Sequence, residues 1–187
     1  MFFTTMIQYT YSVAQANGEY DKSAFGNQWV DAPSQQFLMP FDRPHDLSVS
    51  FYTYLPFGIN ASMTGFYESG VPYTPMIFNG DKPESDLRNK NSKRSDDYKS
   101  ANISLSKHIK FSDYKISLGL NVYNAFNISN ALSIYPLTGE ADDPGEYYLK
   151  EVKLPSEGGA LSGSYYDQPW YFSSPRQINF FVRFEFE

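Results

Sequence analysis

Alternation of apolar and polar residues, repeated along the chain, is the feature that most limits what this sequence can fold into. The alternation recurs in six segments, whereas the spacing of an amphipathic helix does not recur. A period of two places apolar side chains on one face of a β-strand and polar side chains on the other. The segments predicted to be strands are Phe3–Val13, Asp46–Leu55, Ile59–Glu68, Tyr98–Ile109, Tyr114–Phe126 and Arg176–Phe186.

The connections between these segments are alternately long and short. Pro56–Gly58 and Lys110–Asp113 are tight turns, which antiparallel neighbours can use and parallel ones cannot. Ala14–His45, Ser69–Asp97 and Asn127–Pro175 are long and rich in Gly, Pro, Asn, Asp and Ser. Strands of about 10 residues with short periplasmic turns and long extracellular loops are typical of outer-membrane barrels. The pattern therefore predicts an all-β fold, an antiparallel transmembrane β-barrel segment whose C-terminus is periplasmic.

The composition agrees with strands that have two unlike faces. Aromatic residues make up 18% of the 187 residues, although only 41% are hydrophobic. Aromatic rings favour half-buried pleated surfaces and the interfacial girdles of membrane barrels. The sequence contains no apolar run long enough for a transmembrane helix, and no signal peptide is expected at its start. The absence of Cys excludes a disulfide framework, and the net charge of −6 argues against a nucleic-acid partner.

Four stretches carry a more specific pattern. They are Asp42–Val49 with the spacing Asp-x-x-His-x-Leu, Phe66–Pro75 with Ser-Gly-x-Pro-Tyr-Thr-Pro, Asn121–Asn127 with Asn-x-x-Asn-x-Phe-Asn, and Pro175–Ile178 before the last strand. In these stretches the chain resembles the C-terminal barrel of TonB-dependent outer-membrane receptors. The resemblance implies a barrel of about 22 strands around a plug. It also implies an active transporter that takes up a siderophore, haem, cobalamin or a glycan with energy supplied through TonB.

The resemblance also implies where the chain belongs and what it meets. Residues 1–187 are expected to be the C-terminal part of the barrel in a bacterial outer membrane, with the plug and the early barrel strands outside this sequence. The implied partners are outer-membrane lipid, the remainder of the receptor, TonB through the missing N-terminal part, and the barrel-assembly machinery. The resemblance assigns the signal for that machinery to Phe180, Val182, Phe184 and Phe186. It implies no enzymatic activity, no catalytic residue and no cofactor.

The candidate ligand-binding residues are the aromatic residues of the last long connection, Tyr165, Tyr166, Trp170 and Tyr171. Exposed rings can stack on the sugar or catechol faces of a ligand. Alternatively, these rings pack the connection against the rim of the barrel or belong to an interfacial girdle. We favour the packing interpretation.

Other polar groups are weaker candidates for a site. His45 and His108 are far apart in the sequence, and a metal site needs several convergent ligands, so none is predicted. The acidic stretch 139–146 lacks the spacing of an EF-hand and is interpreted as a solvated turn. The mixed charges of 81–97 favour a hydrated, mobile loop tip, with contact to lipopolysaccharide phosphates as the alternative.

Two other functions remain open at this stage. One is a small outer-membrane barrel or adhesin without a plug, although such barrels have at least eight strands and six are found here. The other is a soluble β-sandwich that binds carbohydrate through its aromatic loops. A sandwich buries the apolar faces of two sheets against each other, and its loops need not alternate in length.

Overall fold

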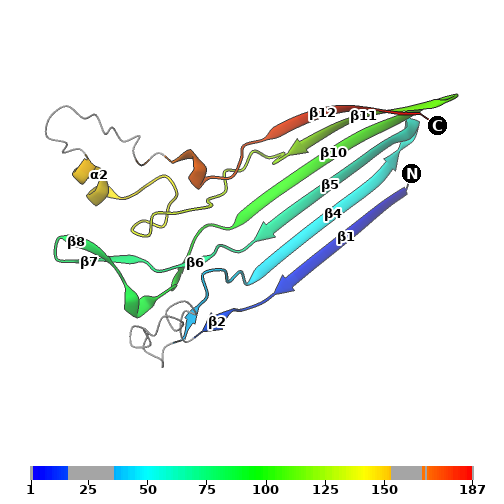
Figure 1. Cartoon of the computed structure of the whole chain (residues 1–187). Helices are drawn as coiled ribbons and strands as arrows, with labels where there is room; N and C mark the ends of the chain where they lie inside the picture. Colours follow the sequence, from blue (N-terminus) through cyan, green and yellow to red (C-terminus); the bar gives the residue numbers. More distant parts are fainter. Residues whose placement is uncertain (1, 17–35, 153–165, 167, 187) are drawn as a thin grey trace.

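The computed structural model describes residues 2–16, 36–152, 166 and 168–186. Its main feature is a single six-stranded sheet in which long strands lie side by side (Figure 1). The order of the strands is β1-β4-β5-β10-β11-β12, and every neighbouring pair is antiparallel. Their bounds are β1 Phe2–Tyr11, β4 His45–Leu55, β5 Ile59–Glu68, β10 Tyr98–Phe111, β11 Tyr114–Tyr123 and β12 Gln177–Phe186. The all-β, antiparallel expectation is confirmed.

The predicted strands differ from the observed ones mainly at their ends. β11 stops at Tyr123 and not at Phe126, because Asn124 adopts a left-handed conformation with φ 50°. β10 and β11 remain paired as far as Phe111 and Tyr114, so their turn is shorter than predicted. Asn is among the residues that tolerate a positive φ most readily, which explains the stop after Tyr123.

The register of the six strands gives the sheet one apolar face and one polar face. On the apolar face, Ile7 pairs with Val49, Phe51 with Met63, and Leu120 with Phe180. On the polar face, Ser50 pairs with Thr64, Thr64 with Asn102, and Asn121 with Asn179. The apolar face is largely uncovered: Ile7 is 68% exposed, Phe180 81% and Phe186 82%.

Phe181 breaks the alternation of β12 because it lies on the polar face, where it is paired with Gly119. A Cβ atom at position 119 would lie 2.1 Å from two carbon atoms of the Phe181 ring. The ring therefore lies directly on the backbone of Gly119, as aromatic residues do beside glycines in designed sheets. This contact explains why an aromatic residue occurs on the polar face at Phe181 and why its partner at position 119 is glycine.

We predict that Gly119→Val displaces the Phe181 ring and destabilises the sheet by about 1–3 kcal/mol, the usual cost of overpacking. Urea unfolding of the protein in lipid, followed by tyrosine fluorescence, measures the change. In the double variant Gly119→Val/Phe181→Ala, the loss should be smaller than the sum of the single losses, because the clash is gone. Additive losses would contradict the contact.

The two ends of the sheet differ. The 3-10 turn Pro56–Gly58 and the β10–β11 turn lie at one end, together with both chain termini, and the long connections leave from the other end (Figure 1). The connections contain short pairs: β2 (Gln15–Ala16) with β3 (Phe37–Leu38), β6 (Pro72–Tyr73) with β9 (Lys93–Arg94), and β7 (Met76–Asn79) with β8 (Lys82–Ser85). They also contain α2 (Glu146–Val152) and the 3-10 turns Leu87–Asn89 and Pro169–Tyr171. None of the described helices is long and apolar enough to cross a membrane.

Buried side chains in the described residues are mostly polar. Apart from three prolines, the buried apolar residues among them are Phe37, Ala101 and Ala141, whereas the buried polar residues are Asp42, Thr53, Ser69, Asp86, Asn91, Ser117, Asn124 and Asn130. The other sheets among the described residues are two-stranded pairs within the connections. The structure therefore does not show the two packed sheets that a β-sandwich requires.

Candidate functional site

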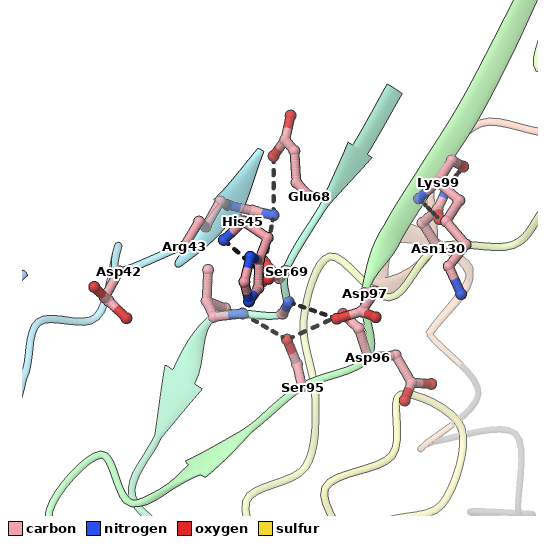
Figure 2. Close-up of polar contacts among 12 residues, drawn as sticks. Asp42, Arg43, His45, Glu68, Ser69, Ser95, Asp96, Asp97, Lys99 and Asn130 are labelled. Carbon is pink, nitrogen blue, oxygen red and sulfur yellow. Dashed lines mark hydrogen bonds and ion pairs between the residues drawn. The ribbon is translucent and has the colours of Figure 1, made fainter. Parts of the chain in front are cut away.

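A cluster of polar residues that form hydrogen bonds and ion pairs with one another lies at the end of the sheet from which the long connections leave. Segments 42–45, 68–71 and 94–97 meet there, beside the ends of β4, β5 and β10 (Figure 2). We call this set of contacts the loop-end network. It includes residues from two of the four family-like stretches, Asp42 to His45 and Ser69 to Val71, and from the charged segment that precedes β10.

Asp42 is the most deeply buried residue of the network, at 2% exposed. Its carboxylate accepts hydrogen bonds from the backbone N–H of Ala14 and from the Arg94 guanidinium, with which it also forms an ion pair. Arg94 Nη1 donates further to the carbonyl oxygens of Asp42, at 3.0 Å, and Gly70, at 2.9 Å. Burial raises the pKa of Asp42, but the Ala14 hydrogen bond and the Arg94 cation outweigh it and hold the pKa below its usual value.

At Gly70 the start of the second long connection lies tightly against the end of the same connection. A Cβ atom at this position would lie 1.8 Å from the carbonyl oxygen of Ser95, so only glycine fits. The backbone N–H of Gly70 donates to Asp97 Oδ1 at 3.1 Å, and that of Val71 donates to Ser95 Oγ at 3.1 Å. Ser95 N–H returns a bond to the Val71 carbonyl oxygen at 3.0 Å. The Ser-Gly stretch is therefore required for backbone packing.

Three residues attach the long connections to the sheet where β4 begins and β5 ends: Arg43, His45 and Ser69. Arg43 forms an ion pair with Glu68 at 2.9 Å and donates to the Ser69 carbonyl oxygen at 3.2 Å. The His45 N–H donates to Ser69 Oγ at 3.2 Å, and His45 Nδ1 lies 2.8 Å from the Tyr9 hydroxyl oxygen. These contacts attach the end of the first long connection and the start of the second to β1 and β5.

The second histidine lies elsewhere on the sheet. His108 Nδ1 is 2.8 Å from Ser117 Oγ, near the end of β10 that carries the short turn. Within the described residues, no group of three or more His, Cys, Asp or Glu side chains is arranged to hold a metal ion.

The asparagine-rich stretch after β11 fastens the third connection. Asn124 Nδ2 donates to the carbonyl oxygens of Ile128, at 2.9 Å, and Ser174, at 3.0 Å, while its N–H donates to Asn102 Oδ1 at 3.1 Å. Asn130 exchanges two hydrogen bonds with the backbone of Lys99, at 2.7 and 2.8 Å (Figure 2). The amide side chains thus replace the β-ladder where the strands end.

The aromatic candidates are only partly described, because Tyr165 lies outside the described residues. The rings of Tyr166 and Tyr171 contact the ring of Tyr135, with centroids 5.9 and 5.1 Å apart. Tyr148 extends this row at 6.1 Å from Tyr166. Tyr135, Tyr148, Tyr166 and Tyr171 all belong to the third connection, so these rings pack against one another within it, and the role of Tyr166 and Tyr171 toward a ligand or the rim stays a prediction. Trp170 differs, because it is 70% exposed.

The charged segments have more structure than a solvated loop tip. The interpretation of 81–97 as wholly hydrated is wrong for Arg94, which binds the buried Asp42, and for Asp97, which accepts from Tyr67 Oη at 2.8 Å. In the stretch 139–146, Asp143 Oδ1 accepts from Gly145 N–H at 2.8 Å, as expected of a turn. The partner of Arg94 is not predictable from the sequence, because residues 42 and 94 belong to different connections.

Phe180, Val182, Phe184 and Phe186, the residues assigned to barrel assembly, share the apolar face of β12. They pair with Leu120, Leu118, Ile116 and Tyr114 of β11. No family model, curated protein or solved structure matches this chain.

Proposed function

We propose that this chain is part of the transmembrane β-barrel of a TonB-dependent receptor in a bacterial outer membrane, where it takes part in the uptake of a scarce nutrient. The observation that carries the proposal is the exposed apolar face, which is continuous across all six strands. An apolar surface of this extent marks a site of contact with a membrane or a protein. Barrel strands meet lipid with one face and the lumen with the other.

The architecture of the connections supports the same proposal. Short turns lie at one end of the sheet and long connections at the other, as in outer-membrane barrels. The loop-end network holds the long connections over this end. The resemblance in the four stretches adds the receptor family, the plug and TonB as partners, and the role of the barrel-assembly machinery.

The two edge strands of the sheet show where the proposed barrel requires further strands. β1 and β12 are the two edge strands, and each has a neighbour on one side only. Unpaired backbone groups are not tolerated in lipid, so further strands must pair with both edges. In this proposal the remaining strands of the receptor supply that pairing, and the polar face meets the plug or lines the lumen.

Cysteine scanning of β12 in the natural protein tests the proposal. The sequence contains no Cys, so a fluorophore on an introduced Cys reports one position of this chain. Positions 178, 180, 182 and 184 are expected to be quenched by a quencher attached to lipid chains, and positions 179 and 183 are not. The protein should also sediment with outer membranes. Recovery in the soluble fraction, or quenching without alternation, would refute the proposal.

A further inference from the structure

The polar face of the sheet contains a pocket that no part of the loop-end network fills. It has a volume of about 320 Å³ and lies between the loop ends of β10 and β11 and the start of β12. A volume near 300 Å³ is at the lower end of the range for ligand pockets. It therefore suits one unit of a larger ligand.

The walls of this pocket carry no charged side chain. They consist of Tyr, Ser, Asn, Gln and Pro residues, although 19% of the whole chain is charged. Glu68, the cross-strand partner of Tyr98, is an acidic residue beside the pocket, and it forms an ion pair with Arg43 at 2.9 Å. A charged ligand would lose water here without meeting a counter-charge.

The walls also carry polar groups that the protein leaves available. Within the described residues, the hydroxyls of Tyr98, Ser100 and Tyr123 and the side-chain amide of Gln177 make no hydrogen bond to protein. Tyr123 and Gln177 are cross-strand partners, so their side chains project from the same face. Hydroxyl and amide groups both donate and accept, as the hydroxyls of a sugar do. The two tyrosines add rings on which a sugar face can pack.

The base of the pocket is held rigidly. Asn124 binds Asn102, Ile128 and Ser174, and Asn130 binds the backbone of Lys99 and Ser173 Oγ. A rigid site binds with a smaller loss of conformational entropy than a flexible one.

From these observations we infer that the pocket binds a neutral, polyhydroxylated ligand unit, such as one sugar residue of an uncharged oligosaccharide. The inference rests on the proposed function, in which this face lines the path of the nutrient. Among the substrates of the proposed receptor, it selects those whose part in contact with this pocket is uncharged.

Binding to the full-length natural protein, purified in detergent, tests the inference. The neutral probes are maltohexaose, cellohexaose and xylohexaose, and the charged probes are oligogalacturonate and oligomeric glucosamine. Isothermal titration is expected to show binding of at least one neutral probe, with each charged probe bound about tenfold more weakly.

Variants of the pocket residues test the site itself. Gln177→Glu and Tyr123→Ala should each lower the affinity for the neutral probe about tenfold, whereas Tyr123→Phe should lower it less because it keeps the ring. Tyr52→Ala, on the same face near the short-turn end, is the matched control and should leave affinity unchanged.

Three results would overturn the inference: no binding of any neutral probe at about 10 mM, equal binding of charged probes, or affinities that the pocket variants do not change. Cross-linking of position 177 to another segment of the same protein, without sugar binding, would show that the pocket is an internal contact. Because these measurements use purified protein, they are independent of the outer-membrane test. If the protein is in the outer membrane but binds no sugar, only the inference about the pocket fails. If it binds sugar but is not in the outer membrane, only the proposed function fails.

Discussion

Replacing Arg94 with Met is expected to open the loop-end network and lower the local free energy of unfolding by about 3–5 kcal/mol, the cost of removing one partner of a buried ion pair. The substitution leaves the Asp42 carboxylate, 2% exposed, without its cation. It also removes the hydrogen bonds to the carbonyl oxygens of Asp42 and Gly70. Hydrogen exchange at the amides of Ala14 and Gly70 measures the opening, because both amides donate within this network.

Lys93→Met is the matched control for Arg94→Met. Lys93 is the neighbouring residue of β9, and its side chain is exposed. The control removes one positive charge from the same strand without touching Asp42, and exchange should change little. Equal exchange in the two variants would show that the ion pair does not hold the connections.

Acid should reduce the difference between the natural protein and the Arg94→Met variant. The pKa of Asp42 is held below its usual value, so the pair stabilises the folded state above the unfolded-state pKa, near 3.8. This contribution is lost as the pH falls through the folded-state pKa. In the variant, burial without Arg94 favours the protonated acid, which needs no cation. As the pH is lowered below the unfolded-state pKa, the exchange rates of the two proteins should therefore converge. A difference that grows with acid would contradict this reasoning.

Replacing Gly70 with Ala is the second change for which we expect a large effect. The added methyl group would lie 1.8 Å from the Ser95 carbonyl oxygen and 2.6 Å from its carbonyl carbon, and both are backbone atoms. The start and the end of the second connection must separate, which breaks the hydrogen bonds of Gly70 to Asp97 and of Val71 to Ser95. The expected loss is at least about 1–3 kcal/mol. Limited proteolysis between residues 70 and 97 should become faster.

Gly65→Ala is the control for Gly70→Ala. A Cβ atom at position 65 would have no heavy atom within 4 Å, and Gly65 lies in the middle of β5. Alanine there should be neutral or slightly stabilising, because glycine in a strand interior is entropically costly. If both alanine variants behave alike, the close approach of Gly70 to Ser95 is not a constraint on the fold.

The strands were predictable from the sequence because each one carries its own alternation. Asp46–Leu55 and Ile59–Glu68 agree with β4 and β5 almost residue for residue. The antiparallel pairing of β4 with β5 and of β10 with β11 followed from the two tight turns, whereas the other pairs are separated by long connections. Exceptions such as Phe181 could not be explained from the sequence, since its partner Gly119 lies on another strand.

The loop-end network was not predictable in the same way. The contact between Asp42 and Arg94 joins residues 52 positions apart, and nothing in a local charge pattern selects one arginine among several. Ser69, Gly70 and Asn124 were noticed only as parts of family-like stretches. Their roles in backbone packing and in ending strands depend on which segments meet, and that is a property of the folded sheet.

The contacts between the connections decide how this part of the molecule responds to heat or to a protease. Arg94 binds Asp42, Asn91 binds the Leu38 carbonyl oxygen, and Lys90 lies over the Phe37 ring, so the first two connections are joined at several places along their described residues. The second and third connections are joined where Met76 N–H donates to the Pro136 carbonyl oxygen and Phe78 contacts Tyr147. Segments joined in this way lose their structure as one cooperative unit. A proteolytic cut or a bound ligand at one connection would thus change the local free energy of unfolding of the neighbouring connections. The free energy of unfolding of the six-stranded sheet would change less.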